Sequence, residues 1–415
     1  MAGETFGKAM LRLRTERGLS LRKLSAKAHL DSGHLCKIEN GKRPSTIDVA
    51  KAVGEALGAV DELVAIANAE RAQRVRTAVP FDPMRRRTLL TWGMAATTLA
   101  SLGVSEGTAP RIGRVGASDA QRLQDSAVRL YGLDYQHGGE SLWQAASVRA
   151  ADGYQMLEHG TYREAVSGQL LRATGRMQMC AGWLAFDAGH HDIARSAYNE
   201  ALSLARQAGD AEVETHALAN LAFQSNVLGR PREALRFAEA AERVAAAPVR
   251  PARLPAIPQL RKAIASALAS DRSVSDKAIT QARTVLDKEA DKPTEEWCAF
   301  LSPAELDGVE ATCAIHLGRA PRAADLLERA IREYGDRYAR NRALYRTRLA
   351  MARLEMGAVD GAAEAANAAL DDLTGEVASW RVSSELHAVA LRLGEYPTVP
   401  GVALFLARYR AYRKT

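Results

Sequence analysis

Aromatic side chains and long apolar runs are scarce in this chain of 415 residues. Aromatic residues make up 6% of it, although hydrophobic residues make up 47%. Because alanine supplies much of that hydrophobic share, the composition favours closely packed helices over β-sandwiches or barrels. The sequence contains no uninterrupted apolar run of about 18 residues, as a membrane-spanning helix requires. We therefore expect an all-α protein that is not bound to a membrane, with two or three domains at this length.

Cysteine is also rare. The four cysteines are Cys36, Cys180, Cys298 and Cys313. Their spacing fits neither a metal site nor a disulfide framework, so we expect no metal, no cofactor and a reducing, cytoplasmic compartment. Cys36 falls in a short predicted helix near the N-terminus, where we interpret it as a small surface or packing residue rather than a redox switch. The N-terminus lacks the apolar segment of a signal peptide.

Motifs of catalysis are missing as well. The chain has no HExxH, no P-loop and no GxGxxG followed by an acidic residue. One GxSxG match occurs at residues 103–107, but a nucleophile elbow needs a strand before it, and this match follows a helical stretch. The paired arginines of residues 85–87 resemble a twin-arginine export signal, yet they lie inside the chain. We interpret residues 71–115 as a linker with a docking helix and expect no enzyme.

Charge is distributed unevenly along the chain. Residues 1–90 carry 17 Lys and Arg against 10 Asp and Glu, whereas the rest carries 39 of each. The whole excess of positive charge therefore lies at the N-terminal end. A basic segment ahead of a neutral body is typical of a tethered nucleic-acid-binding module, although a solvated basic face has the same composition.

The basic segment has the pattern of five short helices. Phe6, Met10 and Leu13 recur at helical spacing and Gly18 closes this first helix, while Ser20 and Asp31 are favourable N-caps for the next two. The predicted helices span residues 5–13, 21–28, 32–39, 46–57 and 60–69. His29 and Leu30 form the turn between the second and third helices, and a glycine at position 41 stops the third.

The string GLSLRKLSAKA, followed by a short turn and LCKIENGKRPS, resembles the helix-turn-helix of the phage-repressor and xenobiotic-response-element (XRE) family. The resemblance covers residues 5–69 and implies a lambda-repressor-like DNA-binding domain at residues 1–70. In that family the third helix enters the major groove of double-stranded DNA N-terminus first.

The resemblance places few base-reading side chains on the third helix. Ser32, Gly33 and Lys37 occupy the positions that face base edges, and His34 reaches either a base or a phosphate. Since only Lys37 offers a specific donor to guanine, we expect specificity to rest largely on dimer spacing and DNA shape. Phosphate contacts are expected from residues that flank the second and third helices: Arg22, Lys23, Asn40, Lys42, Arg43 and Ser45.

The second half of the chain repeats a pattern of small residues. A glycine is followed by alanine five residues later, by Tyr, Leu or Ala after four more, and by alanine after a further three. The four clear copies begin at Gly189, Gly229, Gly318 and Gly357. Weaker copies start at Gly160 with Ala165, and at Ser273 with Ala278 and Ala282. The pattern predicts six helical hairpins in a tetratricopeptide-like α-solenoid spanning residues 116–415.

A solenoid offers a concave groove lined by the first helix of each pair. The repeat register puts Tyr154, Trp183 and Phe223 at equivalent positions in that groove, six residues before each turn. Polar neighbours that we expect around them are Arg176, Asp187, His216, Asn220 and Asn226. This set suits an extended peptide or another signalling ligand, because amides bond its backbone and rings take its side chains. The alternative is that the aromatic residues form core between repeats.

The two-part layout resembles the peptide-pheromone-sensing regulators. That resemblance is architectural, and it implies a homodimer in which a ligand in the repeat domain changes the spacing of two DNA-binding heads. Transcriptional regulation is therefore the predicted function. The rival hypothesis is a scaffold that acts through protein contacts, for which loss of the basic flank would be the signature; this chain retains that flank.

Overall fold

The computed structural model describes residues 5–40, 45–67, 113–246, 251–289, 296–334, 338–375 and 377–414. The chain divides into two compact units, Met1–Met84 and Arg85–Thr415. Throughout the described residues the regular elements are helices, and the one β feature among them is an isolated bridge between Arg114 and Thr161. The predicted all-α fold is confirmed. Most of the expected linker, including its docking helix, lies outside the described residues.

Short helices with capped starts build the N-terminal unit. They are α1 (Phe6–Glu16), α2 (Leu21–Ala28), α3 (Ser32–Glu39) and α4 (Ile47–Leu57), and residues 60–67 are helical as well. The side chain that precedes each of the four helices accepts a hydrogen bond from a backbone N–H of the first turn: Thr5, Ser20, Asp31 and Thr46. These caps satisfy N–H groups that have no partner within the helix. The five predicted helices are present, with boundaries within a few residues.

A small core holds the α2-turn-α3 pair. Leu24 of α2 and Leu35 of α3 are fully buried, together with Phe6 and Met10 of α1. His29 adopts a left-handed backbone conformation (φ 53°) and ends α2, so the chain turns sharply into α3. The predicted turn is confirmed.

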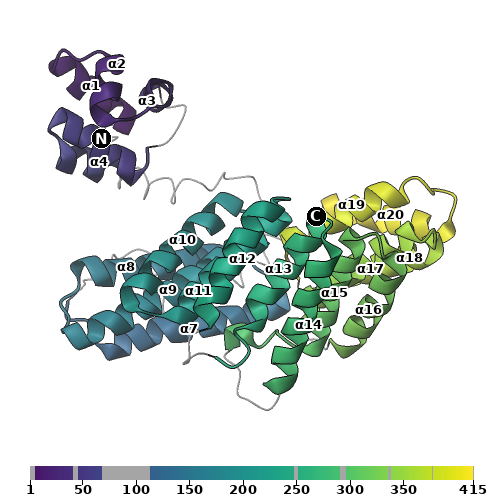
Figure 1. Ribbon diagram of the computed structural model, residues 1–415. Coiled ribbons are helices and arrows are strands. Elements are labelled where there is room, and N and C mark those ends of the chain that lie inside the picture. The colour runs from purple at the N-terminus through teal and green to yellow at the C-terminus, as the bar shows by residue number, and fades with distance from the viewer. Residues whose placement is uncertain are drawn as a thin grey trace. The chain divides into compact units, whose positions relative to one another are not determined.

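The C-terminal unit, called the body below, consists of antiparallel helices (Figure 1). Its helices are α7 (Ala117–His137), α8 (Trp143–His159), α9 (Glu164–Asp187), α10 (His191–Ala208), α11 (Ala211–Val227), α12 (Pro231–Ala245), α13 (Ala256–Leu268), α14 (Arg272–Lys288), the short 3-10 helix η1 (Glu296–Cys298), α15 (Pro303–His316), α16 (Ala320–Glu333), α17 (Ala339–Glu355), α18 (Val359–Thr374), α19 (Trp380–Leu393) and α20 (Pro400–Lys414). From α9 onward, consecutive helices pair as hairpins, while α7 and α8 both pack on α9.

Five of these hairpins share one turn. The residue two positions before the second helix has a positive φ in each: Gly189, Gly229, Ser270, Gly318 and Gly357. Glycine is favoured there because it adopts the left-handed conformation without strain. The residues 5, 9 and 12 positions after the turn residue are buried in every copy, for example Ala234, Ala238 and Ala241 in α12. The four clear copies of the sequence repeat are therefore confirmed as helical hairpins.

The two weaker copies need correction. In α14 the turn residue is Ser270 (φ 62°) rather than Ser273. The buried repeat positions are therefore Ser275, Ile279 and Ala282, and the repeat starts three residues earlier than the sequence pattern indicated. Gly160 has an ordinary extended conformation (φ −75°) and Ala165 is exposed, so the α8–α9 connection does not belong to the repeat. The sixth hairpin is instead α19–α20, whose connection begins at Gly394 with an ordinary negative φ (−58°).

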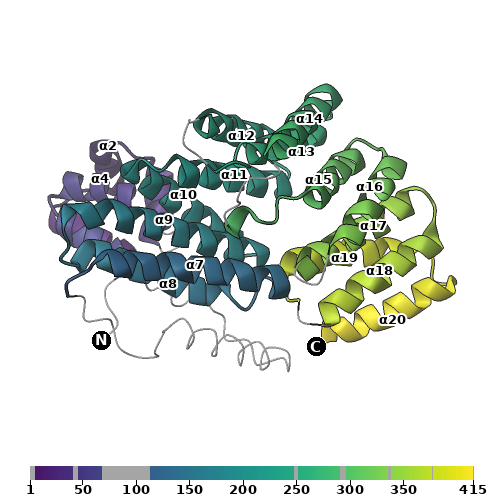
Figure 2. The ribbon, with the colours of Figure 1, turned by 90° about the horizontal axis from the view of Figure 1, so that it is seen from below.

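The body curves back on itself. The first helices of the central hairpins, such as α11 and α15, are buried on nearly every face, whereas the second helices leave one face exposed. Figure 2 shows the hairpins following a curve that brings the C-terminal helices beside α7, and α17 contacts α7 while α19 contacts α9. The curve thus encloses a space between its inner helices. Within the described ranges, no helix has the length and apolar character that crossing a membrane requires.

Candidate nucleic-acid interface and buried cavity

Helix α3 presents a thin polar face. Ser32, Gly33 and Lys37 are exposed on it and His34 is half-buried, whereas Leu35 and Ile38 are buried on the opposite face. Asp31 Oδ1 accepts a hydrogen bond of 2.7 Å from the His34 backbone N–H, which fixes the start of the helix. The side chains predicted to read bases are therefore accessible together on one short helix.

An ion pair that no sequence pattern indicated fixes the C-terminal end of α3. The Arg14 guanidinium binds Glu39 through two hydrogen bonds, Nε to Oε2 at 2.9 Å and Nη2 to Oε1 at 2.8 Å, and donates a third to the Leu19 carbonyl. The hydrogen bond to Glu39 raises the pKa of Arg14. Because this bidentate contact joins α1 to α3, it orients the exposed face of α3.

Gly7 allows α1 to approach the end of α3 closely. A Cβ atom at this position would lie 2.6 Å from the Ile38 carbonyl oxygen and 2.8 Å from that of Glu39. Both obstacles are backbone atoms, so neither can rotate away. A larger residue at position 7 would have to displace α3.

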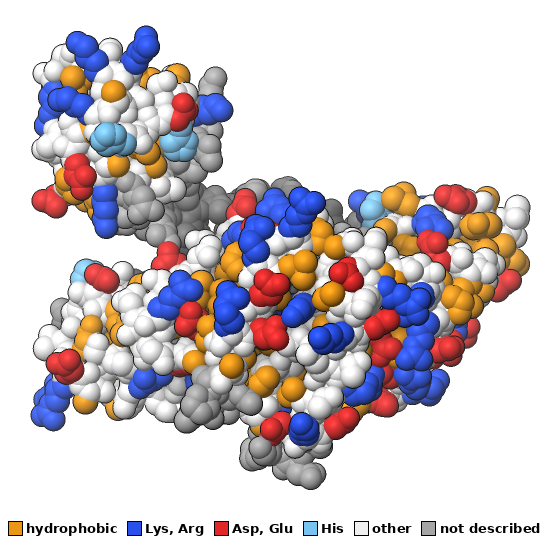
Figure 3. Space-filling view, in the orientation of Figure 1, with side chains coloured by type: hydrophobic (Ala, Val, Ile, Leu, Met, Phe, Trp, Pro, Cys, Tyr) orange, Lys and Arg blue, Asp and Glu red, His pale blue; other side chains and the backbone are white. Residues whose placement is uncertain are grey.

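Most of the predicted phosphate-binding residues are accessible. Arg22 and Lys23 are exposed in the first turn of α2, and Figure 3 shows Lys and Arg side chains across the visible face of the N-terminal unit. Asn40 is exposed after α3, where its Nδ2 donates to the Cys36 carbonyl at 2.8 Å. Ser45 is half-buried, and Lys42 and Arg43 lie outside the described residues.

Residues 10–63 match the family model described as a helix-turn-helix, of the XRE type. The match includes α2, α3 and the turn between them. This family binds DNA in regulatory proteins, so the N-terminal unit supports a DNA-binding regulator. A comparison with curated proteins finds no match to the chain.

The body contains a buried cavity of about 50 Å³ between its inner helices. The wall draws residues from α7, α9, α11, α13, η1, α15, α17 and α19: Tyr131, Tyr135, Trp183, His216, Asn220, Phe223, Ile257, Arg261, Trp297, Phe300, Glu305, Arg340, Asn341, Leu344, Tyr345 and Arg381. Aromatic rings form much of this wall, although the chain as a whole is poor in them. A group of aromatic residues thus lies where the curve closes.

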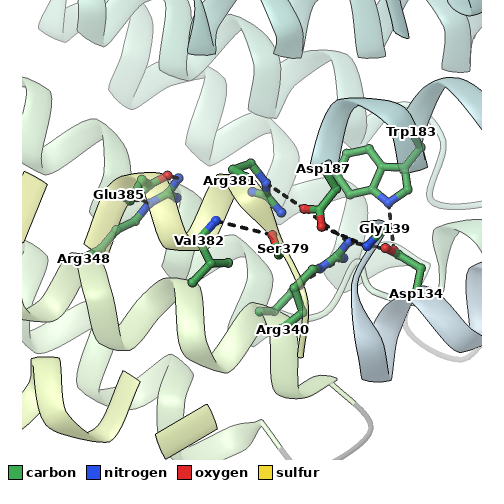
Figure 4. Close-up of polar contacts among 11 residues, drawn as sticks. Asp134, Gly139, Trp183, Asp187, Arg340, Arg348, Ser379, Arg381, Val382 and Glu385 are labelled. Atoms are coloured by element: carbon green, nitrogen blue, oxygen red, sulfur yellow. Dashed lines mark hydrogen bonds and ion pairs between the residues drawn. The ribbon is translucent and has the colours of Figure 1, made fainter. Parts of the chain in front are cut away.

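Charged side chains from both ends of the body meet beside the cavity (Figure 4). Arg340 Nη1 donates to both carboxylate oxygens of Asp134 at 2.7 and 2.8 Å, and Arg381 Nε donates to Asp187 at 3.2 Å. Trp183 Nε1 also donates to Asp134, at 2.8 Å. We call Asp134, Asp187, Arg340 and Arg381 the closing cluster, because it joins α7 and α9 to α17 and α19.

Burial affects the two carboxylates of the closing cluster differently. Loss of water raises the pKa of Asp134 to about 6, against the lowering effect of Arg340. Burial acts on Asp187 in the same direction, but Arg340, Arg381 and the Gly139 N–H at 3.1 Å together lower its pKa. The closing cluster thus depends on its arginines to keep both acids ionised at neutral pH.

Arg261 differs from the other buried arginines. The residue is 5% exposed, its Nε is buried without a partner, and the described residues provide neither a hydrogen-bond acceptor for its guanidinium nor a carboxylate oxygen within 4 Å. The guanidinium lies over the Phe223 ring, with Cζ 4.3 Å from the ring centroid. Burial lowers the pKa of Arg261 to about 10, and the nearby Arg381 adds to that effect while Glu305 opposes it. The residue remains a cation at neutral pH.

Neutral donors satisfy the remaining acid of the wall. Glu305 Oε2 accepts hydrogen bonds of 2.8 Å from the hydroxyls of Tyr334 and Tyr345 and one of 3.2 Å from Asn341. Beyond the cavity wall, Arg348 and Glu385 form a bidentate pair at 2.8 and 2.9 Å. Glu305 therefore has local partners that Arg261 lacks.

The predicted ligand residues divide into two groups. The structure places Trp183, His216, Asn220 and Phe223 in the cavity wall. The others lie outside it and have partners of their own: Tyr154 donates to Glu200, Arg176 pairs with Glu212 beside a second pocket, Asp187 belongs to the closing cluster, and Asn226 donates to the Arg261 carbonyl. Tyr154 is displaced because Gly160 does not share the repeat turn. Sequence reasoning missed Arg261, Arg340 and Arg381, which no repeat position marks.

Proposed function

We propose that this protein is a sequence-specific transcriptional regulator that binds double-stranded DNA through α3. The observation that carries the proposal is the exposed polar face of α3, in a capped helix-turn-helix whose residues 10–63 match the helix-turn-helix family model. Lys37 contacts a base edge and Arg22 a backbone phosphate. The first contact gives specificity and the second gives affinity and register.

The active form is a homodimer whose two heads bind half-sites about 34 Å apart, or a multiple of that distance. The α19–α20 hairpin supports a partner surface, because a stack of hairpins leaves its last member uncovered. Leu391 of α19 is 65% exposed and Leu404 of α20 is 56% exposed, and Figure 3 shows hydrophobic side chains gathered over the C-terminal helices. A second copy of the chain covers this face.

A ligand bound in the body controls the heads. The buried, aromatic-lined cavity supports this role, since its wall joins the two ends of the body and a ligand there favours the closed arrangement over an open one. We thus retain signal-dependent regulation as the function, with the cavity as the sensing site.

The test combines mapping of genomic binding sites in the native host with binding measurements on the site that emerges. Lys37→Ala should weaken binding to the cognate duplex by roughly 5- to 150-fold and leave binding to unrelated duplexes nearly unchanged. Arg22→Ala should weaken binding to both duplexes and reduce the slope of log affinity against log salt by about one.

Both variants alter exposed side chains, so each is the control for the other and both should unfold at the wild-type temperature. Equal behaviour of the two on cognate and unrelated DNA would refute the assigned roles. Absence of enriched genomic sites would refute the proposed regulator and favour the protein scaffold.

Light scattering tests the dimer: Leu404→Lys should halve the measured mass if α20 lies in the interface.

A further inference from the structure

We infer that the buried cavity of the body binds a small carboxylic acid with an apolar or aromatic portion, and that Arg261 is the residue that holds its carboxylate. The inference rests on the proposed sensing role of the cavity. It deepens that role by naming the chemical class of the ligand.

Unmet donors of two arginines face the cavity. Arg261 has five N–H donors and no acceptor for any of them among the described residues, and Arg381 uses only its Nε, toward Asp187. Both guanidinium groups lie near the Phe223 ring, with Cζ at 4.3 and 5.8 Å from its centroid. A carboxylate supplies two acceptor oxygens in the plane that a guanidinium fork requires, so it satisfies these donors better than water does.

The comparison with neighbouring ions makes Arg261 the exception. Arg340 is 3% exposed and has Asp134, and Arg348 has Glu385. A buried cation that forms no ion pair is costly to folding, so its retention in a wall rich in aromatic rings supports an occupant that supplies a carboxylate. Glu305 offsets the charge of Arg261 only in part, because none of its oxygens lies within 4 Å of the guanidinium and its Oε2 accepts hydrogen bonds from Tyr334, Tyr345 and Asn341.

The remaining wall fits a flat apolar group. Trp183 and Phe223 stack with centroids 6.1 Å apart, and His216 and Trp297 stack at 3.9 Å. Burial, together with Arg261 and Arg176, lowers the pKa of His216 to about 3, so that ring is neutral and adds no second anion site. The acid's apolar portion therefore packs against rings while its charge meets Arg261.

Size favours a small molecule over an extended peptide. Each water needs roughly 10–15 Å³ of such space, so the cavity of about 50 Å³ holds about four waters. At about 30 Å³ of liquid volume per water, those four waters occupy about 120 Å³, so the wall must widen slightly to admit an aromatic acid such as benzoate. A peptide would require the closing cluster to separate.

The experiment measures thermal unfolding and calorimetric binding of the full chain without DNA, using benzoate and phenylacetate as probes. Benzamide and phenylacetamide are matched neutral controls, and inorganic phosphate and a short peptide with a free C-terminus are competing anions. We expect an acid to raise the unfolding temperature with one site per chain, and the corresponding amide to have no effect.

Arg261→Met should unfold at a higher temperature than wild type without ligand, because it removes an unpaired buried charge at similar volume. The same variant should bind the acid at least about 30-fold more weakly. Arg261→Lys keeps a charge but loses the fork and should bind with intermediate affinity.

Four results would overturn the inference: equal binding of acid and amide, unchanged acid binding by Arg261→Met, binding of phosphate or of the peptide alone, and no stabilisation by either acid at millimolar concentration. The acid–amide comparison uses wild-type protein, so it is decisive even if a variant does not fold. These measurements contain no DNA, so they test the cavity alone. If the acid binds but a separate measurement finds operator affinity unchanged, this inference stands and ligand control of the heads is refuted.

Discussion

At the scale of single residues, burial can determine the protonation state of a side chain by shifting its pKa away from the ordinary value. His216 lies between Trp297 and the charged edge of the cavity, and its Nε2 faces the Asn220 amide at 3.5 Å. Burial, Arg261 and Arg176 lower its pKa from 6.5 to about 3. Between these values the unfolded chain binds a proton at His216 and the folded chain does not. The contribution of this residue to stability is therefore complete above pH about 6.5 and is lost as the pH falls.

We predict that His216→Phe flattens this acid dependence. The variant keeps a stacked ring, loses the contact with Asn220 and has no proton to bind. Relative to wild type, its free energy of unfolding should improve by up to about 1.4 kcal/mol for each pH unit between 6.5 and about 4.5. Chemical denaturation at several pH values measures this difference.

The pKa of Asp134 is raised to about 6, so this residue makes the folded state more stable as the pH falls, which is opposite to the effect of His216. Because Asp134 acts equally in wild type and variant, the difference between the two proteins isolates His216. His159→Phe changes an exposed residue at the end of α8 and is the control. Parallel pH profiles for wild type and His216→Phe would contradict the prediction.

At the scale of elements, the repeat turn accounts for most of what the helical hairpins share. In each copy the turn residue donates its N–H to a carbonyl three residues back, and the next residue donates to one five back, as Arg230 does to Ser225 at 2.8 Å. Asp271 makes the same bond to Ser266 at 2.8 Å although the turn residue is Ser270. The hydrogen bonds thus set the turn, and glycine only lowers the conformational cost of its positive φ.

The turn predicts a pair of opposite substitutions. Ser270→Gly removes the strain of a positive φ and should stabilise the body by about 0.5–1 kcal/mol. Gly229→Ser places a side chain at φ 67° where no atom lies within 4 Å of its Cβ, so its cost of about 1 kcal/mol is purely conformational. Thermal or denaturant unfolding of the full chain measures both.

The same substitutions also test the corrected register of α14. Ser273→Gly, at the position that the sequence repeat suggested, lies in the first turn of the helix and should destabilise rather than stabilise it. Stabilisation by Ser273→Gly together with no gain from Ser270→Gly would restore the original register.

At the scale of the whole body, the closing cluster holds α7 and α9 against α17 and α19. Asp134 is fully buried and Arg340 is 3% exposed, so their pair has no water to replace a lost partner. Ion pairs on the outer helices differ: Arg329 pairs with Asp307 at 3.0 Å, but its side chain is 44% exposed. Arg340 and Asp134 are 206 residues apart in the chain, whereas Arg329 and Asp307 are 22 apart.

We predict that Arg340→Met destabilises the body by about 3–5 kcal/mol, because it leaves Asp134 buried without its cation. Backbone amides of α7, α17 and α19 should lose protection from hydrogen exchange, and small-angle scattering should detect a larger radius. Arg329→Met, the control, should cost at most about 1 kcal/mol and change neither. Unchanged exchange in α7 and α19 for Arg340→Met would show that the cluster does not hold the ends together.

The sequence by itself determined the features that depend on neighbours along the chain. The caps Ser20 and Asp31, the turn at His29 and the left-handed glycines follow from hydrogen bonds and φ preferences over a few residues, so the helix-turn-helix and four hairpins were predictable. The side chains exposed on α3 follow in turn from helical periodicity.

Tertiary structure alone decided the cavity and its charges. Arg340 and Asp134 are 206 residues apart, and Arg381 and Asp187 are 194 apart. Their meeting depends on the summed curvature of successive hairpins, which no local pattern encodes. The same curvature places Trp183 and Phe223 in the cavity wall, leaves Tyr154 outside it, and encloses Arg261 without a carboxylate oxygen within 4 Å among the described residues.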